Sequence, residues 1–451
     1  MLLSSARRAA LKRRNPLPEG TLSVGVGLLL AGFCAYGFLS VAARALGRQN
    51  YAPLATFWGL LFVCGPGFFF PLEQEVGRAL AARRARHEGG GPLVRRAAIA
   101  GGALTVLLIV AATALAHPLT DRLFNGNGFL LAALLLGLAA YFAEHLARGM
   151  LSGNGRFKPY SLLLGIEGVF RILPCAILAL IGVRSPDLYG FVLVTASFAA
   201  VAVALRGQRG LAAPGRQAPW TELTSALGYL LIASVLTQLF LNVGPIAVQL
   251  LATPQERASG AAGLFLNGLV IARVPLYLFQ AVQASLLPKL AGLASQDRHH
   301  DFRHTLSRIV GFVTGLGGLA TAGAAVLGPF AVRLLFGPGY DLGHADMAYL
   351  AGASGCLMIA LCLTQALISL HGYARAAVGW TAGCAGFVVF TAIGTELFAR
   401  VEHGLLGGSV VGIVVMAVLL IPLLRDRVTP GSPVIPQAPN PAGPAEVRTP
   451  G

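Results

Sequence analysis

Charged residues are scarce in this chain. Asp, Glu, Lys and Arg make up 12% of its 451 residues, whereas 55% are hydrophobic and the mean hydropathy is +0.71. A soluble protein of this length needs more polar surface, so the composition indicates an all-α polytopic membrane protein. The formal net charge of +16 does not imply a nucleic-acid partner, because most basic residues lie in short loops between apolar runs.

Paired cysteines and catalytic motifs are also missing. The six cysteines all fall inside apolar runs and none forms a CxxC pair, so neither a disulfide framework nor a zinc site is predicted. The sequence contains no Walker motif, nucleophile elbow, HExxH motif or metal-spaced His/Cys cluster. We therefore expect no cofactor and no enzymatic activity. If the chain transports a substrate, the energy must come from an ion gradient, the membrane potential or turnover of the substrate.

Apolar runs long enough to cross a bilayer, about 20 residues each, are abundant. They predict twelve spans, of which the second and eighth carry charge and the sixth is short. Gly404, Gly408 and Gly412 form a small-residue ladder that predicts close helix packing in the last span. The predicted spans cover residues 21–43, 52–80, 94–117, 128–150, 159–182, 188–205, 226–251, 259–287, 307–332, 345–371, 375–395 and 403–424.

Basic residues are distributed unevenly between the two sides. The even-numbered loops and the termini are rich in arginine and the odd-numbered loops are not, which predicts that both termini are cytoplasmic. Segment 1–20 is basic, and no small-residue cleavage site ends the run that follows it, which favours an uncleaved first helix. The Pro-rich residues 425–451 are predicted to form a disordered cytoplasmic tail.

The two halves of the chain resemble each other. Thr120-Asp-Arg-Leu-Phe-Asn-Gly-Asn-Gly128 precedes the fourth span and Val332-Arg-Leu-Leu-Phe-Gly-Pro-Gly-Tyr340 precedes the tenth. The matched turns are separated by about half the folded chain, so each repeat would contain six spans. An even number of spans gives both repeats the same orientation, which predicts parallel repeats about an axis along the membrane normal. We predict two six-helix bundles, residues 21–205 and 226–424, joined by a cytoplasmic linker at 206–225 and facing a central cleft.

The second predicted span contains residues that lipid disfavours. Pro66 and Pro71 interrupt its hydrogen bonding and are candidate hinges. Glu73, Glu75 and Arg78 follow, and charge at the centre of a bilayer costs roughly 3 kcal/mol or more per residue. Such a span lines a cavity rather than facing lipid. Glu75 and Arg78 are three apart near the cytoplasmic interface and can also pair there.

Two further pairs of opposite charges have helical spacing. Glu144 and Arg148 are four apart, as are Glu167 and Arg171, so each pair is predicted to form a salt bridge. Structural pairing and a role in ion coupling both remain open for Glu73, Glu75, Glu144 and Glu167. Arg171 and Arg78 are also candidate substrate contacts.

Arg273 has no acidic neighbour at helical spacing. It lies in the middle of the eighth span, so its partner must come from another helix or from a ligand. The planar guanidinium suits a phosphate, and we predict that Arg273 faces the cavity with Asn267 nearby. A bridge to Glu73 or Glu75 is the alternative. Other polar residues on the seventh and eighth spans are candidate sugar contacts or helix-packing groups: Asn242, Gln249, Gln280 and Gln283.

Several short motifs give the chain a resemblance to a known family. Ala45-Leu-Gly-Arg-Gln-Asn-Tyr-Ala-Pro-Leu54, Leu286-Leu-Pro-Lys-Leu290 and Leu334-Leu-Phe-Gly-Pro-Gly-Tyr340, together with twelve spans in two halves, resemble the MOP (multidrug/oligosaccharidyl-lipid/polysaccharide) exporter superfamily. Within it the chain most resembles the polysaccharide-transport branch of Wzx-type oligosaccharide flippases. Lipid II flippases typically carry two further helices, which are not found here.

This resemblance implies a function. It implies a flippase in a bacterial inner membrane that moves an undecaprenyl-phosphate-linked oligosaccharide from the inner to the outer leaflet by alternating access. Membrane lipids, a polysaccharide polymerase and glycosyltransferases are the partners it suggests. One alternative is an ion-coupled multidrug exporter of the same fold. Another is a membrane scaffold for glycan assembly that transports nothing.

Overall fold

The computed structural model describes residues 21–224, 227–296 and 298–425, which are helical and contain no strand. The predicted tail lies outside these ranges except for Arg425, as does the N-terminal segment 1–20. The first half of the chain contains α2 (Thr21–Ala85), α3 (Gly91–Ala114), α4 (Ala116–Pro118), the π-helical turn η1 (Leu119–Leu123), α5 (Gly128–Gly153), α6 (Phe157–Leu180) and α7 (Pro186–Leu205).

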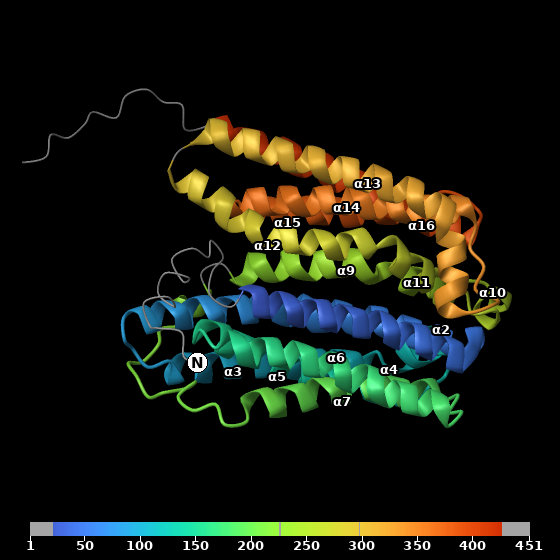
Figure 1. Ribbon diagram of the computed structural model, residues 1–451, viewed down its shortest axis with the longest axis horizontal. Coiled ribbons are helices and arrows are strands. Elements are labelled where there is room, and N and C mark those ends of the chain that lie inside the picture. The colour runs from blue at the N-terminus through green and yellow to red at the C-terminus, as the bar shows by residue number, and fades with distance from the viewer. Residues whose placement is uncertain (1–20, 225–226, 297, 426–451) are drawn as a thin grey trace, which may run out of the picture.

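A short helix, α8 (Thr221–Thr224), precedes the second half of the chain. The second half contains α9 (Leu227–Leu251), α10 (Pro254–Ala258), α11 (Ala261–Ala272), α12 (Val274–Ser295), α13 (His299–Phe336), α14 (His344–Ser369), α15 (Tyr373–Ala392) and α16 (Leu397–Arg425). The long helices run roughly side by side, with those of the first half in one layer and those of the second half in the other (Figure 1).

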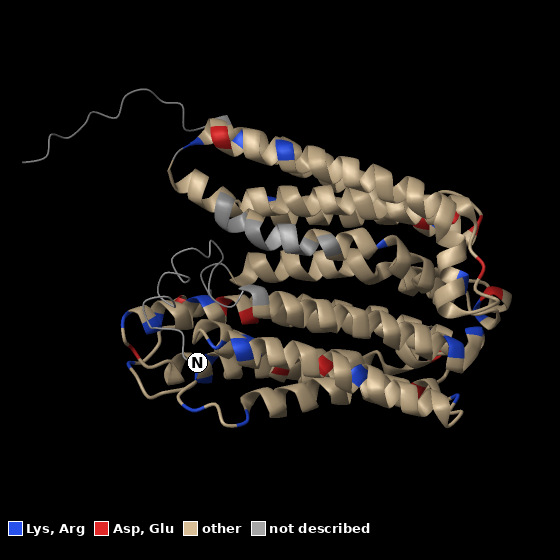
Figure 2. Ribbon diagram, viewed as in Figure 1, with Lys and Arg blue, Asp and Glu red and all other residues tan. Residues whose placement is uncertain are grey.

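The exteriors of these helices are apolar. Ten helices in the described part of the chain are long and hydrophobic enough to cross a membrane, and α2 has the length of two spans. Large apolar side chains such as Leu107, Leu180 and Leu319 are more than 60% exposed. Only a lipid environment covers that much apolar surface, so the protein is a multi-pass membrane protein. Lys and Arg lie mainly towards the two ends of the molecule (Figure 2).

Helix α2 contains the first two predicted spans as two helices that meet at a break. Gly47 is its one residue outside the helical region, with φ 68° and ψ 168°, a conformation that favours glycine. The predicted loop of residues 44–51 is therefore a one-residue break in the helix. The backbone stays helical through Pro66 and Pro71, so a hinge at these prolines remains a prediction.

The eighth predicted span is two helices. Helix α11 ends at Ala272, α12 begins at Val274, and Arg273 lies between them with φ −98° and ψ 0°. Pro275 explains the break, because it has no N–H to continue the hydrogen-bond ladder and its ring clashes with the preceding turn. The hydroxyl of Tyr36 donates to the Val270 carbonyl (2.9 Å) and so gives this turn a partner from the first half.

The two repeated turns lie at the same end of the molecule, which we call the turn end (residues 47–50, 119–127 and 334–340; right in Figure 1). The buried Phe124 and Phe336 anchor them. Each turn also contacts the opposite half. Gln249 of α9 donates to Asn125 of the first turn (2.7 Å).

The second turn is held more extensively. Arg48 of α2 donates to the Gly339 carbonyl (3.0 Å), and Arg44 donates to the Leu335 carbonyl (2.9 Å). The hydroxyl of Tyr340 donates to the Ala43 carbonyl (2.9 Å). These contacts fasten the two halves together at the turn end.

At the opposite, basic end (residues 83–96 and 206–222), the linker between the halves lies on α2. Arg83 donates two hydrogen bonds of 2.8 Å to the carboxylate of Glu222. Arg96 lies over the ring of Trp220, 5.1 Å from its centroid. These contacts hold the linker against the first half at the basic end. The residue bounds of the two predicted bundles remain a prediction.

Candidate functional site

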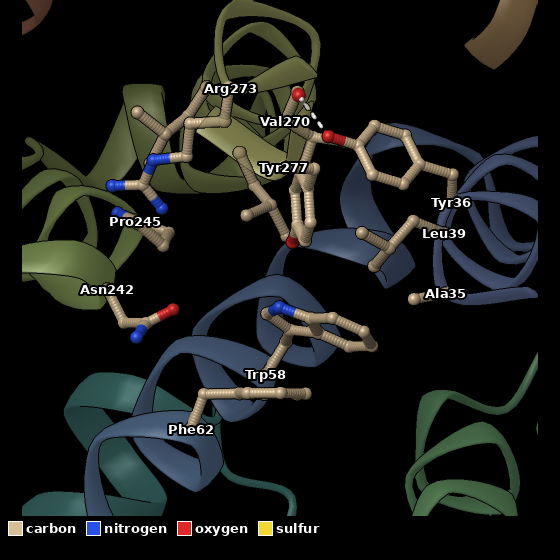
Figure 3. A pocket seen from close by; sticks show the side chains of 12 residues that line it. Ala35, Tyr36, Leu39, Trp58, Phe62, Asn242, Pro245, Val270, Arg273 and Tyr277 are labelled. Atoms are coloured by element: carbon tan, nitrogen blue, oxygen red, sulfur yellow. Dashed lines mark hydrogen bonds between the residues drawn. The ribbon is translucent and has the colours of Figure 1, made fainter. Parts of the chain in front are cut away.

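A pocket lies between the two halves, about midway along the helices. Its cavity volume is about 60 Å³, smaller than the roughly 300–1,000 Å³ of sites that enclose a whole drug-sized ligand. Helix α2 supplies one wall, while α9, α11, α12 and the α11–α12 break supply the other (Figure 3). The lining residues are Ala35, Tyr36, Leu39, Trp58, Phe62, Asn242, Pro245, Leu266, Leu269, Val270, Arg273 and Tyr277.

Arg273 is the charged residue of the pocket lining. Its position at the break between α11 and α12 turns the side chain toward the pocket (Figure 3), and its Nε is buried with no hydrogen-bond partner. The alternative bridge to Glu73 or Glu75 is absent, because both acids have other partners in the first half. Arg273 is half-buried and has no carboxylate beside it, so the pocket suits a ligand that brings negative charge.

Aromatic rings form the opposite wall of the pocket. Trp58 stacks on Phe62 with centroids 4.5 Å apart. Tyr277 reaches into the pocket one helical turn after Arg273, with its ring edge against Tyr36 at 5.3 Å (Figure 3). The pocket thus combines a cation with broad aromatic faces and a few polar groups.

Behind Trp58 lies a group of buried charges that we call the ion cluster: Glu73, Glu144, His145, Arg148, Tyr160, Glu167 and Arg171. They come from α2, α5 and α6. Arg148 pairs with Glu144 and with Glu167 (3.0 Å), and Glu167 pairs in turn with Arg171. A second part of the cluster is centred on Glu73, which contacts His145 Nδ1 at 2.7 Å and accepts a hydrogen bond from Tyr160 at 2.9 Å.

The pocket and the ion cluster share a wall. The Arg171 guanidinium lies 5.8 Å from the centroid of the Trp58 ring. Phe62 meets Tyr141 at 6.1 Å, and Tyr141 stacks on His145 at 6.0 Å. One layer of aromatic side chains therefore separates a ligand in the pocket from the buried charges.

The predicted pairs at helical spacing are confirmed, since Glu144 pairs with Arg148 and Glu167 with Arg171. The contacts between helices were not predicted. His145 and Tyr160 were not recognised as partners of Glu73, nor Arg148 as the link between the two pairs. Spacing along one helix gives no information on which helices touch. The signal in the sequence for these contacts was the presence of charged residues inside apolar spans, because such residues need partners.

The other predicted site residues lie outside the pocket. Arg171 belongs to the ion cluster. Arg78 pairs with Glu75 (2.7 Å) and donates to the Glu222 carbonyl (2.9 Å) at the basic end. Asn267 is fully buried and accepts a hydrogen bond from Tyr51 (3.0 Å), which joins the halves. The roles of Arg171, Arg78 and Asn267 as substrate contacts remain predictions. Arg273, the fourth predicted contact, lines the pocket.

The additional polar candidates separate in the same way. Asn242 lines the pocket, and Gln249 binds the first turn. The side chains of Gln280 and Gln283 lie outside the described residues. Among the described residues, no group of three or more His, Cys, Asp or Glu side chains has the arrangement of a metal site.

Comparison with known sequences gives relatives of unestablished function. No protein-family model matches the chain. The uncharacterized protein Rv1510 of Mycobacterium tuberculosis is 26% identical over 413 residues, which cover 89% of this chain and 91% of that protein. The uncharacterized protein Rv3630 of the same organism is 24% identical over 409 residues, covering 88% and 91%.

Comparison with solved structures identifies the fold. A mutant of the Vibrio cholerae MATE transporter VcmN matches with a TM-score of 0.67 and 17% identity, covering 91% of this chain and 97% of that one. A multidrug resistance MATE family transporter of the MOP superfamily matches in its outward-facing conformation with a TM-score of 0.63 and 13% identity, covering 90% and 96%. Its inward-facing counterpart gives 0.60 and 14%, covering 93% and 99%. The chain is thus an all-helical membrane protein with the fold of these MATE transporters.

Proposed function

We propose that this protein is an alternating-access transporter that moves an anionic, lipid-linked oligosaccharide from the inner to the outer leaflet for cell-surface polysaccharide biosynthesis. The carrier would be a polyprenyl phosphate or diphosphate of the undecaprenyl type. One observation carries the proposal: a pocket between two helical halves holds Arg273, which has no acidic partner. The fold shared with MATE transporters supports transport as the general activity.

The chemistry of the pocket favours an anion. A guanidinium donates two parallel hydrogen bonds to a phosphate, and each charge-assisted bond contributes about 1.5–3 kcal/mol. Its partial burial strengthens the attraction, because fewer waters screen the charge than at the surface. The pocket is far smaller than a whole lipid-linked glycan, so it would hold the phosphate and the group beside it while the lipid and the remaining sugars extend outside.

Multidrug export is the second candidate, and the aromatic wall favours it. Trp58, Phe62 and Tyr277 present π faces that attract organic cations. Arg273 opposes it, because a cationic drug would be bound beside a fixed positive charge. The aromatic faces suit the anionic glycan equally well, since they also pack against apolar faces of sugars.

The ion cluster supports coupling to a proton or another cation. Glu73, Glu144 and Glu167 supply three carboxylates, whereas Arg148 and Arg171 supply two guanidinium groups. One negative charge is therefore left for His145 or for an incoming cation to balance. If this charge drives the cycle, Glu73→Gln will stop transport in purified vesicles and leave substrate binding within about twofold of wild type. Unchanged transport would remove Glu73 from the coupling mechanism.

We further propose that the protein lies in a bacterial inner membrane with both termini in the cytoplasm. A polysaccharide polymerase and glycosyltransferases would be its functional partners. A gene neighbourhood that contains such enzymes would support this assignment. A neighbourhood of drug-response genes would favour the multidrug alternative.

The binding test compares ligands that differ in charge. Purified protein in detergent is titrated with farnesyl diphosphate, farnesol and ethidium, with empty micelles as the blank. We expect tightest binding of farnesyl diphosphate and a loss of about tenfold or more in Arg273→Ala. Arg375→Ala is the matched control, because Arg375 donates to the Leu419 carbonyl away from the pocket.

Two results would contradict the proposal. Preferential binding of ethidium that improves in Arg273→Ala would indicate a cation exporter. Equal weak binding of all three compounds, together with normal surface glycan in a strain that carries Arg273→Ala, would favour the non-transporting scaffold.

A further inference from the structure

We propose that the pocket contains a subsite for the sugar attached to the phosphate, formed by Tyr277, Asn242 and Trp58. This inference rests on the proposed function and adds to it the recognition of a particular part of the substrate. Arg273 would bind the phosphate, and the three other residues would bind the first sugar ring.

Tyr277 supplies the surface on which a sugar can lie. It lies four residues after Arg273, and its N–H donates to the Arg273 carbonyl (3.3 Å), so the two residues are one turn apart and both line the pocket. That spacing suits a sugar joined to a phosphate through one oxygen. The Tyr277 side chain is 44% exposed, far more than the buried Trp58, and its ring points into the pocket (Figure 3).

The tyrosine ring is also held in place. Tyr36 packs against it in an edge-to-face arrangement at 5.3 Å, and the Tyr36 hydroxyl is itself bonded to the Val270 carbonyl. A ring that is already ordered loses little conformational entropy when a ligand stacks on it. The pocket thus offers a preformed aromatic face beside a cation.

Polar groups around this face distinguish a sugar from a prenyl chain. The Asn242 amide nitrogen donates within α9, to the carbonyl and the side-chain oxygen of Gln238, which leaves its Oδ1 to accept from a ligand. The indole nitrogen of Trp58 points toward Asn242 (Figure 3), and no described residue accepts a hydrogen bond from it. The Tyr277 hydroxyl likewise has no partner among the described residues.

These groups match the two sides of a pyranose. The C–H groups on one face of the ring pack against an aromatic surface, and the hydroxyls at its rim both donate and accept hydrogen bonds. A prenyl chain would leave Asn242 and the indole nitrogen without partners, which costs binding energy. The combination therefore selects a sugar next to the phosphate and leaves the lipid outside the pocket.

The test measures the affinity that a sugar adds at constant charge. The probes are farnesyl diphosphate esters whose terminal phosphate carries a methyl, glucosyl, galactosyl or N-acetylglucosaminyl group, so that all are diesters of equal charge. Affinities are measured by calorimetry on the full-length protein in detergent. We expect at least one glycosyl ester to bind wild type roughly tenfold more tightly than the methyl ester.

The variants separate stacking from hydrogen bonding. Tyr277→Leu should reduce the advantage of the glycosyl ester to about twofold or less, whereas Tyr277→Phe keeps the aromatic face and most of the advantage. Asn242→Leu should weaken the glycosyl ester severalfold and leave the methyl ester unchanged, since the amide contacts only its own helix. Arg273→Ala should weaken all four esters.

Each remaining outcome has a defined meaning. If no glycosyl ester binds more tightly than the methyl ester while all require Arg273, the sugar subsite is wrong and the phosphate site stands. The subsite is also wrong if Tyr277→Leu keeps the full advantage. If no ester binds, or if Arg273→Ala changes nothing, the proposed function fails and the subsite fails with it.

Discussion

Arg148 provides the most quantitative test of the ion cluster. It links two acidic residues on different helices, Glu144 of α5 and Glu167 of α6, and its side chain is 16% exposed. Replacing it by methionine keeps the length of the side chain and removes the charge. Two buried carboxylates would then share Arg171 as the remaining cation. Removing one partner of a buried ion pair costs about 3–5 kcal/mol, because the other charge stays buried.

A second substitution should restore part of that loss. Glu144→Gln in the Arg148→Met background removes the carboxylate with the least access to solvent, since the Glu144 side chain is fully buried. The double variant therefore buries one unpaired charge fewer and should recover about 2 kcal/mol of the free energy of unfolding. Such non-additivity is characteristic of residues in direct contact.

Arg298 is the matched control. It forms a salt bridge with Asp301 on the surface, with 56% of its side chain exposed, so Arg298→Met should cost less than about 1 kcal/mol. Unfolding is followed in mixed micelles of increasing denaturing detergent, and the wild type, the two variants, Arg298→Met and Glu144→Gln alone, which completes the double-mutant cycle, are compared under one condition. If Arg148→Met is no more costly than Arg298→Met, the cluster does not stabilise the fold as described. An additive double variant would refute the coupling between Glu144 and Arg148.

Three further predictions concern other parts of the molecule. Arg44→Ala combined with Arg48→Ala removes hydrogen bonds at the turn end, so a spin-label pair across the two halves there should report a larger open population; an unchanged distance distribution would contradict this. The Arg83 hydrogen bonds lower the pKa of Glu222 below its usual 4.5, so this contact is complete above pH 4.5 and is lost as the pH falls through the lower folded value. Hydrogen exchange of residues 206–222, corrected for the intrinsic rate, should therefore increase in that acidic range. It should also increase at pH 7 in Glu222→Gln. If Glu222→Gln and wild type are equally protected at pH 7, the linker is held by other contacts. Gly408→Val should destabilise the protein by about 1–3 kcal/mol, since an added Cβ would lie 2.6 Å from a backbone oxygen of α15; a stability within 0.5 kcal/mol of wild type would show that the helices separate easily.

Much of the architecture could be predicted because bilayers impose a simple length rule on helices. The apolar runs predict the helical class, and the glycine ladder predicts close packing in the last span, for which the structure supplies the partner helix α15. Spacing within one helix also predicts the pairs at Glu144 and Glu167. Each of these inferences uses neighbours along the chain.

The remaining features depend on contacts between distant segments. The helix breaks at Gly47 inside α2, and again at Arg273 between α11 and α12. At the second break the carbonyl of Val270 accepts a hydrogen bond from Tyr36 of the other half, and no pattern within the eighth predicted span specifies that contact. The partners of Glu73 likewise come from α5 and α6, and no pattern in α2 specifies them.

Transbilayer movement of a lipid-linked sugar tests the central proposal most directly. Purified protein is reconstituted into liposomes that carry a fluorescent polyprenyl-diphosphate saccharide in both leaflets, and a membrane-impermeant quencher reports the fraction that reaches the outer leaflet. The account predicts nearly complete quenching with wild type, about half with empty liposomes, and strongly slowed movement with Arg273→Ala but not with Arg375→Ala. Quenching that stays at half with wild type, or equal rates in both variants, would contradict it.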